Sequence, residues 1–140
     1  MSTLLGAINA SASALDAQRT RMEVAVSNLA NAESTRSADG KPYRRREVVL
    51  ESQPFGSSMD LASGAAGVKV AAVLEDQSAF HMRHEPSHPD ADADGNVYTP
   101  NVEVPEEMVD MLGAARAYQA NLTAIGLIRD TIQRALELAK

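Results

Sequence analysis

The sequence contains no cysteine and no tryptophan, and among its 140 residues only two are phenylalanine and three are tyrosine. The absence of cysteine excludes disulfides, thiol catalysis and thiolate metal sites. The large aliphatic residues and phenylalanine together number 29, whereas 24 residues are alanine. So little large apolar volume indicates a thin, elongated molecule, with much of its stability supplied by partners.

The charge and the motif content narrow the class of protein further. The net charge is −6 at pH 7, which disfavours nucleic acid as the main partner. The N-terminus lacks a basic region followed by an uninterrupted apolar run, so we expect no cleaved signal peptide, and no apolar run approaches transmembrane length. Nothing resembles a nucleophile with its base or a phosphate-binding glycine loop, so we expect no enzyme and no small-molecule substrate.

The last third of the chain, residues 104–140, places apolar residues in alternating steps of three and four. This heptad spacing predicts one long helix with a narrow apolar stripe. Pro105 suits the first helical turn, whereas Val104 is a poor N-cap, so the pattern leaves the exact start of the helix open. The residues expected to form an assembly seam are Met108, Met111, Tyr118, Leu122, Ile125, Ile132 and Leu136.

Residues 2–32 repeat the same stepping and predict a second long helix. Two seams of equal period favour mutual pairing, although the pattern leaves open whether they pair within one chain or between chains. Unpartnered stripes bury too little surface to offset ordering entropy, so we hypothesise that both terminal segments are largely disordered in the free chain and order on assembly. The N-terminal seam residues are Leu5, Ile8, Leu15, Met22, Val26 and Leu29.

The middle of the chain, residues 36–103, predicts a small β-rich segment. Strands are expected at 47–51 and 67–74, with a mobile loop rich in Ser, Gly and Ala at 52–66 between them. Residues 77–101 predict an extended segment with at most short strands, since prolines interrupt it. The sequence therefore predicts an elongated α+β chain divided at 1–35, 36–103 and 104–140, in which the terminal helices form a coiled-coil-like bundle.

Two polar clusters in the middle segment invite comparison with metal sites. Asp90 to Asn96 reads D-x-D-x-D-G, like the first half of a calcium loop, but Asn101 stands where such a loop needs a bidentate Glu. We therefore favour an acidic turn and expect no metal and no cofactor. A surface loop is also the favoured interpretation for three histidines that lack a fourth ligand: His81, His84 and His88.

Several charges are candidates for contacts between subunits. The basic stretch from Lys41 to Arg46 and the acidic stretch from Asp90 to Asp110 would form complementary faces, or else simply solvated surface. Two arginines lie inside the apolar seams, where they either reach out to water or pair with a neighbouring carboxylate. The candidate intersubunit charges are Arg19, Arg44, Arg45, Arg46 and Arg129.

The segment Ser27-Asn-Leu-Ala-Asn-Ala32, preceded by Ala17-Gln-Arg19, resembles the N-terminal motif of the bacterial flagellar axial proteins of the rod and hook. Further segments narrow the resemblance to the proximal rod family FlgC, in the right order along nearly the whole chain. These are Gly40-Lys-Pro-Tyr-Arg44, Gly67-Val-Lys-Val70, His88-Pro-Asp-Ala-Asp92, Glu107-Met-Val-Asp-Met111 and Arg116-Ala-Tyr-Gln-Ala-Asn121. The motif residues are Ser27, Asn28, Leu29, Ala30, Asn31, Arg116, Tyr118 and Asn121.

The resemblance implies a structural subunit of the flagellar basal-body rod, which crosses the periplasm. It implies delivery by the flagellar type III export apparatus without signal cleavage. Assembly with copies of itself and with neighbouring rod proteins would use the terminal helices, which surround the export channel and transmit torque. Departures from the family pattern occur at Glu23, Glu103 and Pro105. Two alternatives stay open, namely a distal rod or hook protein of the same superfamily and a calcium-binding adhesion or regulatory module.

Overall fold

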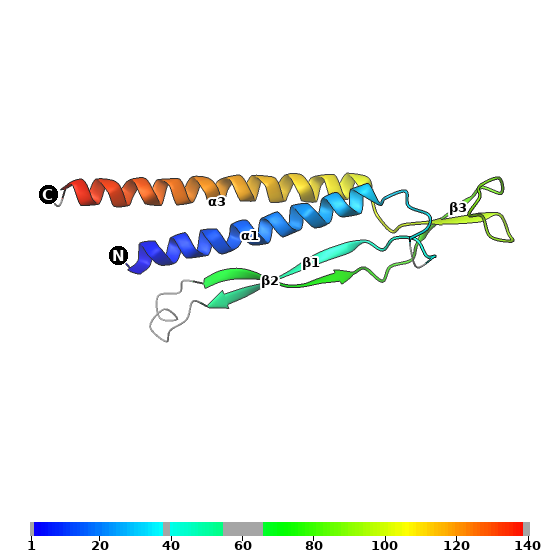
Figure 1. The fold of residues 1–140 in the computed structure, drawn as a ribbon, viewed down its shortest axis with the longest axis horizontal. Helices are drawn as coiled ribbons and strands as arrows, with labels where there is room; N and C mark the ends of the chain where they lie inside the picture. The colour runs from blue at the N-terminus through cyan, green and yellow to red at the C-terminus, as the bar shows by residue number, and fades with distance from the viewer. Residues whose placement is uncertain (1, 38–39, 55–65, 139–140) are drawn as a thin grey trace.

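The structure, a computed structural model, describes residues 2–37, 40–54 and 66–138. The elements in chain order are α1 (Ser2–Ala30), β1 (Arg46–Pro54), β2 (Ala66–Glu75), β3 (His81–His84), β4 (Asn96–Thr99) and α3 (Val104–Leu138). Two long terminal helices thus flank two antiparallel hairpins, which confirms the predicted α+β class. Both chain ends lie at one end of an elongated molecule, and the β3–β4 hairpin projects at the other (Figure 1).

Helix α1 is the middle layer of the molecule (Figure 1). It packs against α3 on one side and against the β1–β2 hairpin on the other, so the two terminal helices pair within one chain. The alanines Ala17, Ala25 and Ala114 are buried in the helices, where small side chains let backbones approach closely. The fully buried helix residues all belong to the second half of α1 or the first half of α3. The helices are therefore packed most tightly toward the end that carries the β3–β4 hairpin.

The β1–β2 hairpin is longer than the sequence predicts. Its register runs from Arg46 opposite Glu75 to Pro54 opposite Ala66, with one irregularity between Val49 and Leu50. Residues 52–54 were predicted as loop and are strand, because backbone pairing with 66–68 continues past the last apolar residue of β1. At the other end of the predicted mobile loop Ala66 is also strand, as the first residue of β2, and residues 55–65 lie outside the described residues. The backbone N–H of Val68 donates to the Ser13 hydroxyl at 3.1 Å and so attaches the hairpin to α1.

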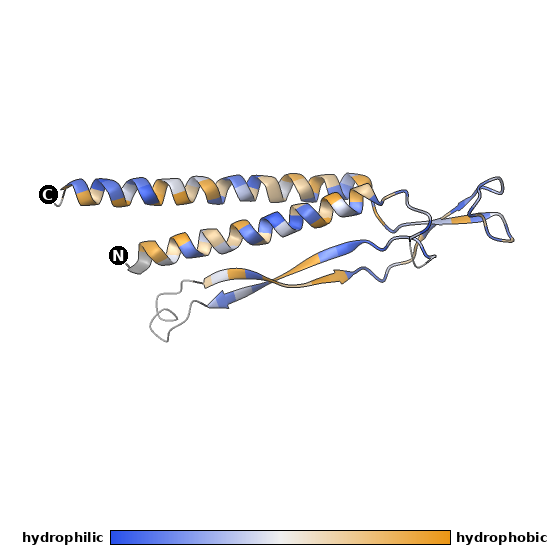
Figure 2. Cartoon of the chain, in the orientation of Figure 1, coloured by the Kyte–Doolittle hydropathy of each residue, from blue (hydrophilic) through white to orange (hydrophobic). Residues whose placement is uncertain are grey.

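The helix ends follow local polar chemistry. Helix α1 stops two residues before the predicted end, where the side chain of Asn31 donates to the Ser27 carbonyl at 2.8 Å. Helix α3 begins at Val104 with Pro105 in its first turn, and the Glu103 carbonyl accepts the Glu107 N–H at 3.1 Å. Apolar residues are distributed along the whole length of both helices (Figure 2). Within the described ranges, neither helix is long and apolar enough to cross a membrane.

The β3–β4 hairpin consists of two four-residue strands paired from His81 opposite Thr99 to His84 opposite Asn96. This confirms the prediction of at most short strands in residues 77–101. Gly95 closes the hairpin with a φ of 77°, a conformation that favours glycine, and an added Cβ would lie 3.0 Å from the Pro86 ring. The shape of this hairpin end is therefore tied to the glycine.

Candidate functional site

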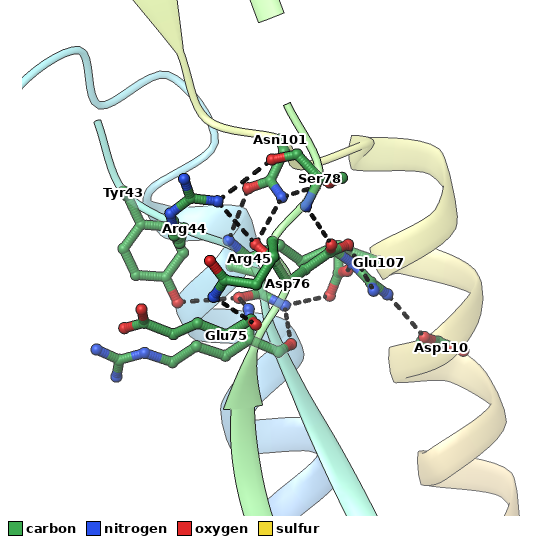
Figure 3. Close-up of polar contacts among 12 residues, drawn as sticks. Tyr43, Arg44, Arg45, Glu75, Asp76, Ser78, Asn101, Glu107 and Asp110 are labelled. Carbon is green, nitrogen blue, oxygen red and sulfur yellow. Dashed lines mark hydrogen bonds and ion pairs between the residues drawn. The ribbon is translucent and has the colours of Figure 1, made fainter. Parts of the chain in front are cut away.

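A cluster of polar side chains joins the end of α1, the start of β1 and the start of α3 (Figure 3). Its members come from five separate stretches of the chain, and the buried ones are surrounded by partners instead of water. We call it the polar joint. It consists of Asn28, Tyr43, Arg45, Asp76, Asn101 and Glu107.

Asn28 is the centre of the polar joint and is only 1% exposed. Its amide nitrogen donates to the Arg46 carbonyl at 2.9 Å and to Glu107 Oε2 at 2.9 Å. Its amide oxygen accepts the Arg46 N–H at 3.0 Å and the Tyr43 hydroxyl at 2.9 Å. Two donors and two acceptor sites are all that an asparagine side chain offers in plane, so Asn28 is saturated. The Asn28 amide bonds both the N–H and the carbonyl of Arg46, as the backbone of a neighbouring strand would.

Glu107, in the first turn of α3, is the most deeply buried charge among the described residues, at 2% exposure. One carboxylate oxygen accepts from Asn28, and the other accepts from Arg45 Nε at 2.6 Å. Both oxygens are therefore paired, as a buried charge requires. The carboxylate also lies at the positive end of the α3 dipole, which adds to its stabilisation.

Arg45 carries the positive charge of the joint, and its side chain is 19% exposed. Burial lowers the pKa of Arg45, but the hydrogen bond and charge of Glu107 outweigh this effect, so the pKa is raised above its ordinary value. The guanidinium also lies 3.9 Å from Asp76 and 3.7 Å from Asp110. Asp110 in turn lies 3.7 Å from Arg21 of α1, so the ion pairs continue from Arg45, just before β1, across α3 to α1.

Asn101 connects the middle segment to the same joint. Its amide oxygen accepts the Arg45 N–H at 2.9 Å, and its nitrogen donates to the Asp76 carbonyl at 3.2 Å and to the Ser78 hydroxyl at 2.7 Å. The backbone and side chain of Ser78 donate to Asp76 and, with the Arg45 and Arg44 charges, hold the pKa of Asp76 below its ordinary value. The segments before and after the β3–β4 hairpin are thereby tied to the start of β1.

The geometry of the polar joint supports a mechanical role. Each buried donor and acceptor is paired within the chain, and among the described residues no buried side-chain nitrogen or oxygen lacks a partner. Such a closed network rigidifies the elements that it joins. The sequence analysis placed Glu107 only in a family segment and in the acidic stretch from Asp90 to Asp110, and it left Asp76 and Asn101 without a site. No local pattern marked Glu107, because its place on the inner face of α3, seven residues before Ala114, is defined only by the burial of both residues in the structure.

The predicted assembly seam is divided into two rows by the structure. One row on each helix is half-buried, and its members follow one another at intervals of seven residues. This row consists of Ile8, Leu15, Met22, Leu29, Met111, Tyr118, Ile125 and Ile132. The other predicted seam residues form a second, exposed row, namely Leu5, Val26, Met108, Leu122 and Leu136. The inner face of α3 uses Glu107, Ala114, Asn121 and Ile128 in place of these outer positions. The period predicted from sequence is therefore present, but the face that meets α1 is rotated toward Glu107.

The predicted motif residues have distinct positions. Asn28 and Asn31 make the bonds described above, and the Ser27 hydroxyl lies 3.3 Å from the Tyr43 hydroxyl. Leu29 is half-buried and Ala30 is exposed. On α3, Tyr118 faces inward, Arg116 is exposed, and Asn121 donates to the carbonyl one turn before it at 2.8 Å. The N-terminal motif thus contributes directly to the polar joint, and the C-terminal motif lies along the helix.

The five candidate intersubunit charges differ in how far they are used within the chain. Arg45 is engaged in the joint, and Arg44 donates to the carbonyls of Asp76 and Ser78 while lying 4.4 Å from the Phe80 ring centre. Arg19 forms an exposed 2.9 Å pair with Glu23 on the same helix. The side chains of Arg46 and Arg129 are exposed at the surface of the chain.

Carboxylates of the acidic turn and the histidine His81 contact neighbouring side chains or backbone groups. Asp90 accepts from the Thr35 hydroxyl at 2.8 Å and lies 3.5 Å from Arg36. Asp92 accepts the N–H groups of residues 94 and 96 at 2.9 and 2.8 Å. His81 lies 3.4 Å from Glu103. Over residues 2–37, 40–54 and 66–138, no three His, Asp or Glu side chains are grouped so as to hold a metal.

Comparison with known proteins gives full-length relatives. The chain is 43% identical to the flagellar basal-body rod protein FlgC of Bacillus subtilis, over 99% of both chains. It is 42% identical to that of Salmonella typhimurium over 98% of both, and 36% identical to that of Borreliella burgdorferi over 96% of this chain and 97% of the relative. The chain belongs to the FlgC family of flagellar basal-body rod proteins.

Residues 93–138 also match the family described as flagellar basal body rod FlgEFG protein C-terminal. This match covers β4 and all of α3, including Glu107. The resemblance predicted from the sequence motifs is thereby confirmed. As a member of the FlgC family, the chain is a structural rod subunit of the bacterial flagellar basal body.

Proposed function

We propose that this rod subunit assembles with copies of itself and with neighbouring rod proteins through the outward faces of α1 and α3. The helices would line the export channel and transmit torque through side-chain packing, and no residue would act in catalysis. Delivery would be through the flagellar type III export apparatus. The observation that carries the proposal is the exposed apolar surface of α3.

At about 100° per residue, Val104, Met108, Leu112 and Leu122 lie within one strip about 80° wide on α3. Val109, Leu127 and Leu138 form a second, narrower strip beside it. All seven are exposed, from 42% for Leu122 to 89% for Leu138. Apolar strips of this length on a single chain favour burial against other subunits. A helix with one covered and two uncovered apolar faces is suited to a multi-helix tube.

The polar joint supports the torque part of the proposal. Load applied to the helices reaches the hairpins through the hydrogen bonds of Asn28 and Glu107, which connect α1 and α3 to β1. A closed, buried network changes geometry less under load than exposed single contacts do, because its members constrain one another. The joint would therefore keep the outer hairpins fixed to the helical shaft.

The test is to replace Leu122 with Glu and to follow secretion, recovery in isolated basal bodies, and motility. A charge at the centre of a buried interface between helices is costly. We therefore expect normal secretion but loss of the subunit from basal bodies. Thr131→Glu, at an exposed polar position outside both strips, is the matched control and should assemble. Normal incorporation of the Leu122 variant would show that this strip is not an assembly surface.

A further inference from the structure

Next to the polar joint lies a hollow with basic and aromatic walls, which we call the cradle. Its walls include Lys41, Tyr43, Arg44, Arg46 and Phe80, together with the single carboxylate of Glu75. Each aromatic ring faces a guanidinium, since Arg44 lies 4.4 Å from the Phe80 centre and Arg46 lies 5.6 Å from the Tyr43 centre. The exposed Lys41 and Arg46 leave the cradle with a net positive charge.

The end of the β3–β4 hairpin, residues 85–95, has the opposite character, and we call it the tip. It carries Asp92 and Asp94, both exposed, and in the described parts of the chain neither is ion-paired. Two exposed prolines, Pro86 and Pro89, lie on the same loop. The other tip carboxylates are used within the chain, by Arg83 and by Arg36.

The tip is ordered before any partner arrives. The Glu85 N–H donates to the Gly95 carbonyl at 2.9 Å, and the Asp92 N–H donates to the Asn96 carbonyl at 2.9 Å. Asp92 accepts two more backbone N–H groups through one carboxylate oxygen, which leaves the other oxygen for an external donor. The hairpin projects from the end of the molecule opposite the chain termini (Figure 1). A preformed projecting loop binds with little loss of conformational entropy.

We propose that the tip of one copy docks in the cradle of a second copy of this chain, which deepens the proposed self-assembly by naming one of its contacts. The carboxylates of Asp92 and Asp94 would pair with Lys41 and Arg46. The proline rings would lie against Tyr43 and Phe80, since apolar rings and aromatic faces pack well. We choose a second copy as the partner because the acidic tip and the basic cradle are complementary in charge and both occur on this chain. A tip-to-cradle contact is head-to-tail and therefore continues from copy to copy.

The absence of cysteine makes a direct test possible. Full-length Asp94→Cys and Lys41→Cys chains are mixed under mild oxidation, so that a disulfide between the two variants reports contact between copies. Gln53→Cys, an exposed site on β1, replaces Lys41→Cys as the control. We expect the tip–cradle disulfide to form well above the control and to fall with added salt.

Charge exchange gives an independent readout in sedimentation of the purified chain. We expect Lys41→Glu with Arg46→Glu to weaken association roughly tenfold, as two exposed ion pairs allow. Adding Asp92→Lys and Asp94→Lys to the same chain should restore it. Failure of this restoration, or a disulfide yield equal to the control, would overturn the proposal.

The outcome separates this contact from the proposed function. If Leu122→Glu still removes the subunit from basal bodies while the tip and cradle fail to cross-link, helix-mediated assembly stands and the contact between copies does not. Cross-linking of Asp94→Cys in basal bodies to a different rod protein, without any product between two copies, would also overturn the proposal in favour of that other partner.

Discussion

The side chains of Asn28 and Glu107 share a 2.9 Å hydrogen bond, although 79 positions separate them in the chain. The bond joins the end of α1 to the first turn of α3, and both residues are almost fully buried. Around it, Arg45 and the backbone of Arg46 bring in the start of β1. The helical shaft and the hairpins are therefore held at a single point.

Removing the buried carboxylate is expected to destabilise the chain strongly. Glu107→Ala leaves Arg45 and the Asn28 amide without their main partner, at a cost of about 3 kcal/mol in the free energy of unfolding. Urea unfolding followed by circular dichroism measures this. Glu106→Ala, the exposed neighbour in the same turn, is the control and should cost under about 1 kcal/mol. Equal effects of the two substitutions would show that the joint contributes nothing beyond the helix dipole.

Replacing Asn28 with leucine keeps the branched shape of the side chain but removes all four hydrogen bonds. We expect the amide of Arg46, which donates directly to the Asn28 side chain, to lose its protection from hydrogen exchange. The amide of Asp76 donates to the Arg45 carbonyl and should be affected less. Asn28→Asp should cost at least as much stability, because it places a second negative charge against Glu107. Asn9→Asp, at an exposed site of α1, is the control.

Acid should weaken the joint through Asp76. Its pKa is held below the ordinary value, first by the Ser78 hydrogen bonds and then by the arginine charges. A carboxylate with a lowered folded pKa contributes stability above its unfolded pKa of about 4 and loses it as the pH falls through the folded pKa. The urea concentration at the unfolding midpoint should therefore fall when the pH is lowered below about 4, and it should fall less in Asp76→Asn. Identical pH profiles for the two chains would contradict this assignment.

Arg129 tests whether a seam charge sets the register between subunits. Its side chain is exposed on α3, in the same seven-residue row as the exposed Leu122 and Leu136. We expect Arg129→Leu to be secreted normally but to reduce correct placement in the rod, because a polar residue in an apolar seam disfavours wrong registers. Soft-agar motility and recovery in basal bodies measure this. Normal motility in the variant would remove the register hypothesis and leave Arg129 as a solvated side chain.

Hydrogen exchange of the free chain and of the assembled rod tests whether the terminal segments order on assembly. The fully buried helix residues lie near the polar joint, and the distal halves of α1 and α3 are half-exposed. We therefore expect weak protection in the free chain that falls toward both chain ends, and strong protection of both helices in the rod. Uniform strong protection in the free chain would instead show that the helix pair is self-sufficient.

The contacts that surround the polar joint were only partly predictable. The motif around Asn28 marked an important residue, but its three partner residues lie 15 to 79 positions away and share no local pattern with it. Arg45 looked like one of three equivalent surface arginines. Its neighbours on either side point elsewhere because successive side chains along an extended segment alternate in direction. Which of the three is buried depends on where the residues leading into β1 meet the first turn of α3.

What the sequence determined by itself is what depends on neighbours along the chain. The heptad spacing set two long helices, Pro105 suited the first turn of the second without fixing its start, and the β-branched runs marked the two long strands. These follow from periodicities of 3.6 and 2 residues and from backbone chemistry. Only the tertiary structure decided which face of α3 meets α1, that α1 lies between α3 and the hairpin, and that Glu107 is buried. Those outcomes depend on pairs brought together across many residues, because burial energy is a property of the packed elements and not of any one segment.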